Sequence, residues 1–173
     1  LFDKPLIAWT IGAAKAARCL DSVLVSTDDP EIEAVASKFG AAVIPRPGYL
    51  SDDGTPKMEA IRHAFRTLES QGKAPEIVVS LQANSPELKA SDIDRAVIKL
   101  RQHGLWEVLS VDKDGVQNAA IRVMHKDCLF NSFLSAHLGV VETSCLDVHT
   151  ADDIDTLQRK YPDAAALTAN MRS

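Results

Sequence analysis

Long apolar runs, clustered cysteines and an excess of positive charge are all missing from this sequence. No stretch approaches the roughly 20 apolar residues of a membrane-spanning helix, and the first residues lack a signal-peptide pattern. Three scattered cysteines do not make a disulfide framework and favour a reducing, cytoplasmic compartment. With 24 acidic and 19 basic residues, the net charge is −5. We therefore expect neither a nucleic-acid nor a membrane partner.

The common short catalytic motifs are missing as well. The chain has no P-loop, G-x-G-x-x-G, C-x-x-C, H-E-x-x-H or G-x-S-x-G sequence. Its 173 residues are 46% hydrophobic and 25% charged, which is typical of one globular domain with a sizeable core. Function must therefore be inferred from where polar residues fall relative to predicted strands and helices.

Short apolar runs alternate with amphipathic segments along most of the chain. The runs predict strands over 22–29, 41–47, 76–82, 106–111, 119–124 and 138–146. Residues 3–17 resemble a helix start, and helical spacing of apolar residues predicts helices over 30–40 and 91–104. It also predicts a helix bearing Met58, Ile61, Phe65 and Leu68, and a last one bearing Ile154, Leu157 and Tyr161. This alternation indicates an α/β fold with a mostly parallel sheet and helices on both faces. The Asp-Gly link within 110–120 predicts a hairpin.

Ligands of such sheets bind beyond the carboxyl ends of the strands. Four polar clusters stand there: "STDD" (26–29), "PRPGYLSDDGT" (45–55), "LQANSPE" (81–87) and "LDVHT" (146–150). Each of them also has a purely structural interpretation, as a helix cap or a turn.

In the first three clusters, particular side chains suit a helix cap, a ligand contact or a turn. Asp28 or Asp29 suits a helix cap. Arg46, between two prolines, suits a phosphate or a carboxylate, or is a surface arginine. Gln82 and Asn84 have amides that hydrogen-bond a base or a sugar, or they belong to a polar turn.

Asp147 and His149 form the fourth cluster. Strand alternation would place both on one face, where they suit a divalent ion or a hydrogen-bonded pair. A capped turn into "ADDID" explains the same residues.

In this order, the residues resemble the acylneuraminate cytidylyltransferase family, whose members activate sialic-acid-like sugars as CMP-sugars. The resemblance lies in "KPLIAWTI" (4–11), "VLVSTDDPEIEAVASKFGAAVIPRP" (23–47), "SLQANSPELKASDIDRAV" (80–97), "NAAIRVM" (118–124) and "LDVHTADDI" (146–154). It implies a Rossmann-like fold of the nucleotide-diphospho-sugar transferase type, and usually a homodimer. It also implies transfer of CMP from CTP to a 2-keto sugar acid, with Mg²⁺ as cofactor and release of pyrophosphate.

The resemblance also assigns roles to individual residues. Ser26 and Arg46 would bind the nucleotide, and Asp147 would hold the metal. The remaining residues would contact the sugar acid; they are Gln82, Asn118, Arg122 and Phe133.

Four departures from the family pattern stand out. The family's glycine-rich phosphate loop precedes the "KPLI" block, so we expect residues 1–173 to be a single domain that lacks its N-terminal strand and this loop. A dimerisation excursion is usual near 113–116. Arg122 replaces a common tyrosine, and His149 replaces an acid. Because Mg²⁺ prefers oxygen ligands, His149 would reach it through water or act as a base on the sugar hydroxyl.

Two other functions are compatible with these residues. One is a related sugar nucleotidyltransferase, such as CMP-ketodeoxyoctonate synthetase. The other is a non-catalytic nucleotide- or sugar-binding relative. "LQANSPE" resembles the sialic-acid branch more than the ketodeoxyoctonate branch.

Overall fold

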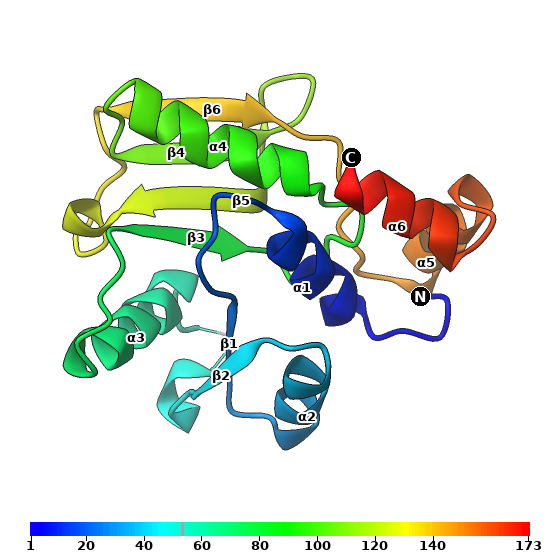
Figure 1. The fold of residues 1–173 in the computed structure, drawn as a ribbon, viewed down its shortest axis with the longest axis horizontal. Coiled ribbons are helices and arrows are strands. Elements are labelled where there is room, and N and C mark those ends of the chain that lie inside the picture. Colours follow the sequence, from blue (N-terminus) through cyan, green and yellow to red (C-terminus); the bar gives the residue numbers. More distant parts are fainter. Residues whose placement is uncertain (53) are drawn as a thin grey trace.

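The computed structural model describes residues 1–52 and 54–173 (Figure 1). Residue 53, within the predicted "PRPGYLSDDGT" cluster, lies outside the described residues. The helices are α1 (Leu6–Ala16), α2 (Pro30–Lys38), α3 (Lys57–Ser70), α4 (Ala90–Gln102), α5 (Ala151–Lys160) and α6 (Ala164–Arg172), with short 3-10 turns at Gly48–Leu50 and Lys126–Cys128. The strands are β1 (Leu24–Thr27), β2 (Ala42–Pro45), β3 (Ile77–Leu81), β4 (Glu107–Val111), β5 (Gln117–His125) and β6 (Leu138–Glu142).

All six predicted strand regions contain a strand, but the sheet differs from the predicted one. β1 and β2 pair in parallel as a two-stranded sheet, and the other four strands pair in the order β3-β5-β4-β6. β5 runs antiparallel to both β3 and β4, and only β4 and β6 are parallel in this sheet. The expectation of a mostly parallel sheet is therefore wrong, and the sheet is mixed. The reason is the predicted hairpin: a tight turn from Asp112 to Val116 joins β4 to β5, and such a turn can only connect antiparallel strands.

Helices cover both faces of the four-stranded sheet, as the alternation predicts. On one face, Val79, Val108 and Val123 belong to a core cluster with apolar residues of α4, α1 and α6. On the other face, Met124 packs with Phe65 of α3. Register explains the division, because Met124 and Val123 are consecutive residues of β5 and their side chains point to opposite faces.

Helix α1 contributes to the packing of both sheets. Ile11 belongs to a small cluster with Ala36 of α2, beside β1 and β2. Trp9 and Ala13 belong to the large cluster under β3 to β6. These two sets alternate around the helix, so α1 connects the two-stranded unit to the four-stranded one (Figure 1).

Helix α6 is absent from the sequence prediction. The side chain of Asp163 caps it by accepting a hydrogen bond from the Ala166 amide at 2.8 Å. Leu167 and Met171, four residues apart, are buried in the large core cluster. The cap and this spacing are the signals in the sequence, but the segment is too rich in alanine to show a clear apolar stripe.

Two other expectations concern membranes and cysteines. Among the described residues, no helix is long and apolar enough to cross a membrane. The three cysteines are free thiols, and burial raises the pKa of the Cys145 thiol to about 12.

The outer edge of β6 is covered by cationic side chains from α4. Lys99 Nζ donates to the carbonyl oxygen of Val140 at 2.7 Å, and Arg95 Nη2 donates to that of Glu142. Two carbonyl groups at the rim of the sheet thus have hydrogen-bond partners.

A bulge interrupts the pairing of β4 with β5. The register shifts between Leu109 and Val111, and Ala119 adopts a left-handed backbone with φ of +58°. Ser110 bridges the irregularity, because its hydroxyl donates to Asn118 Oδ1 at 2.6 Å and accepts from the Ile121 amide at 2.8 Å. A residue with a Cβ is strained in this conformation by about 1 kcal/mol.

We therefore predict that Ala119→Gly stabilises the protein by about 1 kcal/mol, because glycine adopts a positive φ without strain. Urea unfolding measures the change. Ala120→Gly is the matched control: Ala120 is buried at an ordinary φ, so the same chemical change there should lower stability. Equal destabilisation by both substitutions would contradict the assignment of strain to Ala119.

Candidate functional site

The clusters after β1 and β2 lie together, as parallel pairing of these strands predicts. Arg46 Nη2 donates to Asp28 Oδ1 at 3.0 Å, and Arg46 Nε donates to Ser51 Oγ at 3.0 Å. Hydrogen bonds from Ser51 and then from Arg46 lower the pKa of the Asp28 carboxyl. The guanidinium of Arg46 is about a quarter exposed, and only part of its five-donor fork is occupied by these two contacts.

Asp29 and Ser26 have different surroundings. Asp29 caps α2 by accepting hydrogen bonds from the Glu31 and Ile32 amides at 2.7 and 3.3 Å, which confirms the structural interpretation for this residue. In the described part of the chain, the buried hydroxyl of Ser26 has no hydrogen-bond partner. Buried hydroxyls are usually paired, so the lack of a partner for Ser26 Oγ is unusual.

The clusters after β3 and β6 also meet. Asn84 Nδ2 donates to the Val148 carbonyl at 2.9 Å, and the Val148 amide donates to the Asn84 carbonyl at 2.9 Å. Next to this pair, the buried Ser85 hydroxyl donates to Asp147 Oδ1. The "LQANSPE" and "LDVHT" clusters are therefore in direct contact through both backbone and side-chain hydrogen bonds.

Asp147 and His149 are not on a strand, because β6 ends at Glu142. His149 is exposed, and its backbone amide donates to Asp153 Oδ2 at 2.9 Å. Thr150 and Asp153 form a capping box at the start of α5. The capped-turn interpretation is therefore correct for residues 149–153, whereas Asp147 lies outside the cap.

Buried Glu87 anchors the segment that carries Asp147. Its carboxylate accepts hydrogen bonds from the Leu146 amide at 3.0 Å and from the Tyr161 hydroxyl at 2.8 Å. It also pairs with Lys160 at the end of α5. Burial, followed by the Glu87 contact, raises the pKa of the Tyr161 phenol. The loop after β3 is thus tied to both ends of the segment from 146 to 161.

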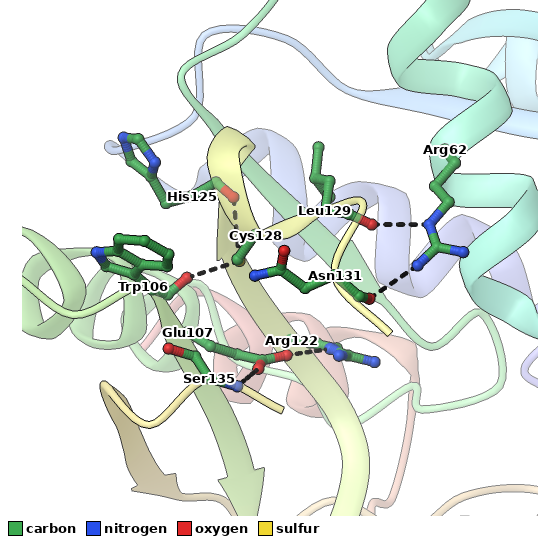
Figure 2. A network of polar contacts seen from close by, with 9 residues as sticks. All are labelled: Arg62, Trp106, Glu107, Arg122, His125, Cys128, Leu129, Asn131 and Ser135. Atoms are coloured by element: carbon green, nitrogen blue, oxygen red, sulfur yellow. Dashed lines mark hydrogen bonds and ion pairs between the residues drawn. The ribbon is translucent and has the colours of Figure 1, made fainter. Parts of the chain in front are cut away.

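Asn118 and Arg122, predicted to contact the sugar, are engaged within the sheet. Asn118 Nδ2 donates to Thr143 Oγ1 at 2.7 Å. Arg122 Nε donates to Oε1 of buried Glu107 at 2.6 Å (Figure 2). Arg122 remains partly exposed, so its outer nitrogens still reach solvent.

The segment from 128 to 135 is held by backbone contacts (Figure 2). Arg62 of α3 donates to the carbonyl oxygens of Leu129 and Asn131 at 2.7 and 2.9 Å. The Ser135 amide donates to Glu107 Oε2 at 3.3 Å. Phe133, between these anchors, is 86% exposed and packs into no core cluster. An aromatic side chain presented in this way is available to stack on a ligand.

A cavity of about 430 Å³ opens between α1, α2, α3 and the end of β3. Its described lining consists of Leu6, Ile7, Ile32, Lys57, Gln82, Ala83 and Asn84. Gln82 and Asn84, both from the predicted "LQANSPE" cluster, are in this lining. Lys57, which the sequence does not single out, donates from Nζ to Gln82 Oε1 at 2.9 Å.

Asp147 is the side chain that fits a magnesium ion. Mg²⁺ in nucleotide sites is held by one or two carboxylates, waters and phosphate oxygens, so a full protein cage is not required. Among the described residues, no cluster of three or more metal-ligating side chains occurs. The Ser85 hydroxyl donates to Oδ1 of Asp147, which leaves Oδ2 as the oxygen that would face a metal ion.

Solved structures of other proteins have the same fold. CMP:2-keto-3-deoxy-manno-octonic acid synthetase in complex with CTP superposes with a TM-score of 0.71 at 15% identity, covering 91% of this chain and 87% of that one. A cytidylyltransferase from Leptospira borgpetersenii superposes with a TM-score of 0.66 at 14% identity, covering 90% and 75%. The chain therefore shares the α/β fold of these two structures.

The sequence comparisons identify the family. Residues 1–132 match the sequence model described as Cytidylyltransferase, and this chain belongs to that family. N-acylneuraminate cytidylyltransferase A of Danio rerio is 36% identical over 107 residues, which are 62% of this chain and 24% of that protein. Pseudaminic acid cytidylyltransferase of Campylobacter jejuni is 37% identical over 101 residues, which are 58% and 44%. The match thus spans less than half the length of these relatives.

We predict that Arg46→Met raises the pKa of Asp28 part of the way toward its usual value, because it removes the Arg46 hydrogen bond while the larger effect of Ser51 remains. Carboxyl-detected NMR titration measures this pKa. Folding lowers it, so the stability it contributes is present above the unfolded pKa and is lost as pH falls through the folded pKa. Arg66→Met, which alters an arginine stacked on Phe130, is the control. An unchanged pKa in Arg46→Met would refute the contact.

Proposed function

We propose that this protein transfers CMP from CTP to a sialic-acid-like 2-keto sugar acid and releases pyrophosphate. The observation that carries the proposal is the junction of the β3 and β6 clusters, where Ser85 binds Asp147 beside the Asn84–Val148 pair. Under this proposal, Asp147 would hold the metal ion next to the loop after β3, whose amide groups would bind the sugar acid.

The substrate class is supported by the relatives. Those with 34–37% identity are named for N-acylneuraminate and pseudaminic acid, both 2-keto sugar acids. A structural neighbour is named for 2-keto-3-deoxy-manno-octonic acid, so CMP-ketodeoxyoctonate synthesis is the second candidate. All of these sugars present a carboxylate and an anomeric hydroxyl, which are the groups that the site must recognise.

In the proposed reaction, the anomeric oxygen of the sugar forms a bond to the α-phosphorus of CTP, and the bond from that phosphorus to the pyrophosphate oxygen breaks. The hydroxyl proton passes to a base. His149 is the proposed base, since its imidazole is exposed and an unprotonated imidazole nitrogen can accept a proton. Magnesium, when bound, would neutralise charge on the phosphates, and Asp147 would hold it.

The other proposed contacts are those that the family resemblance implies. Ser26, with its unpaired hydroxyl, and Arg46, with free N–H groups, would bind the nucleotide at the ends of β1 and β2. Gln82 would bind the sugar acid from the cavity. The remaining sugar contacts would come from Asn118, Arg122 and exposed Phe133. We also propose a homodimer, as the resemblance implies.

The function is tested by pyrophosphate release from CTP with a panel of keto-sugar acids. We expect Mg²⁺-dependent release with an acylated nonulosonic acid and little with ketodeoxyoctonate. Release with ketodeoxyoctonate alone would favour the second candidate. CTP binding without release from any sugar would leave a non-catalytic nucleotide-binding relative.

We predict that Asp147→Asn lowers turnover at least ~100-fold at saturating CTP, because an amide carries no charge to hold the metal. The amide oxygen can still accept the Ser85 hydrogen bond, so the fold should persist. Turnover measured across a Mg²⁺ series checks this, and a higher magnesium requirement is expected.

Asp155→Asn, which changes an exposed acid of α5, is the matched control and should leave turnover unchanged. Turnover by Asp147→Asn equal to that of this control would remove Asp147 from the metal site. His149→Ala tests the base separately: a rate within a few-fold of the unsubstituted protein would exclude His149 from proton transfer.

A further inference from the structure

The side chain of Gln82 is held from its backbone to its tip. The backbone N–H of Gln82 donates to the Ala120 carbonyl at 3.1 Å, and this hydrogen bond continues the pairing of β3 with β5 by one residue. Its carbonyl accepts from Thr10 Oγ1 of α1 at 3.1 Å. At the tip, Oε1 accepts from Lys57 Nζ at 2.9 Å. Few rotamers are open to a side chain whose backbone and terminal amide are both hydrogen-bonded.

The Lys57 contact determines which way the Gln82 amide points. An ammonium group has three N–H donors and no acceptor, so it can contact only the oxygen of the amide. The Nε2 group must therefore point away from Lys57, with two N–H donors. Gln82 thus acts as a donor toward a ligand, whereas an unconstrained glutamine can act as donor or acceptor.

The surroundings favour an anionic partner for these donors. The described cavity lining contains Lys57 and no carboxylate, and most of its other side chains are apolar. The side-chain amide of Asn84 donates to the Val148 carbonyl, so this donor is already engaged and Gln82 Nε2 is the amide donor left for a ligand. A charge-assisted hydrogen bond from Lys57 and a second donor from Gln82 would both suit an anion.

We propose that Lys57 and Gln82 together form a two-donor site for a substrate oxyanion, in which Lys57 supplies the charge and also orients the Gln82 amide. This inference rests on the proposed function and adds to it a binding residue, Lys57. A carboxylate of the sugar acid and a phosphate of CTP share the required chemistry.

Two substitutions test the site. Lys57→Met keeps the length of the chain and removes the charge. Gln82→Glu keeps the shape and replaces the two donors by a carboxylate, which would pair with Lys57 and repel an anion. Titration of ¹⁵N-labelled protein with N-acetylneuraminate, its uncharged methyl ester and CTP, each added alone, gives dissociation constants. The Gln82 side-chain NH₂ signals report contact directly.

We expect Lys57→Met to weaken binding of one anion at least about 10-fold, and Gln82→Glu to weaken the same anion at least as much. If the site binds the carboxylate, both variants should bind N-acetylneuraminate only as weakly as its methyl ester, and their affinity for CTP should be unchanged. If the site binds a phosphate, both variants should lose affinity for CTP alone. The matched control is Lys73→Met, which changes an exposed lysine in the turn after α3. This control should leave every constant unchanged.

The proposal would be overturned if Lys57→Met bound both anions with dissociation constants within about two-fold of those of the unsubstituted protein. So would the absence of binding by either anion to the unsubstituted protein. These outcomes are separable from failure of the proposed function: a protein that binds an anion through Lys57 but releases no pyrophosphate retains this site and loses the assigned reaction.

Discussion

Buried Glu87 is the group on which the arrangement of the site depends. A carboxylate removed from water is costly unless charged and hydrogen-bonding partners surround it. Here the partners come from Leu146, Lys160 and Tyr161, so satisfying one acid brings the end of α5 and the segment before it against the loop after β3. The contact between Ser85 and Asp147 follows from this arrangement. An acid outside the proposed chemistry thus positions an acid within it.

Much of the fold is predictable because it is encoded locally. Among the described residues, short apolar runs mark all six strands, and helical spacing or a helix-start pattern marks each α-helix except α6. The rule that ligands bind at the carboxyl ends of strands selects the four polar clusters, and these prove to meet in pairs, through Arg46 with Asp28 and through Ser85 with Asp147. Family membership is likewise predictable, because the matching residues occur in the right order.

What could not be predicted depends on register and on distant contacts. The predicted hairpin implies that β5 runs antiparallel to β4, whereas the alternation of strands and helices along the chain predicts parallel strands. Glu107 looks like an ordinary strand residue until pairing places it beside Arg122. Lys57 lies in a polar segment 25 positions from Gln82, and only the packing of α3 brings their side chains together. Asp147 and His149 separate because the strand ends before them.

The cationic cover over the rim of β6 affects how the molecule behaves among its own copies. An open sheet rim invites the backbone of another chain to add a strand, and such additions repeat into fibres. With Lys99 and Arg95 already bound to the carbonyls of Val140 and Glu142, an incoming strand would have to displace two charged side chains before it could pair. At high protein concentration this rim therefore resists the templated growth that leads to amyloid.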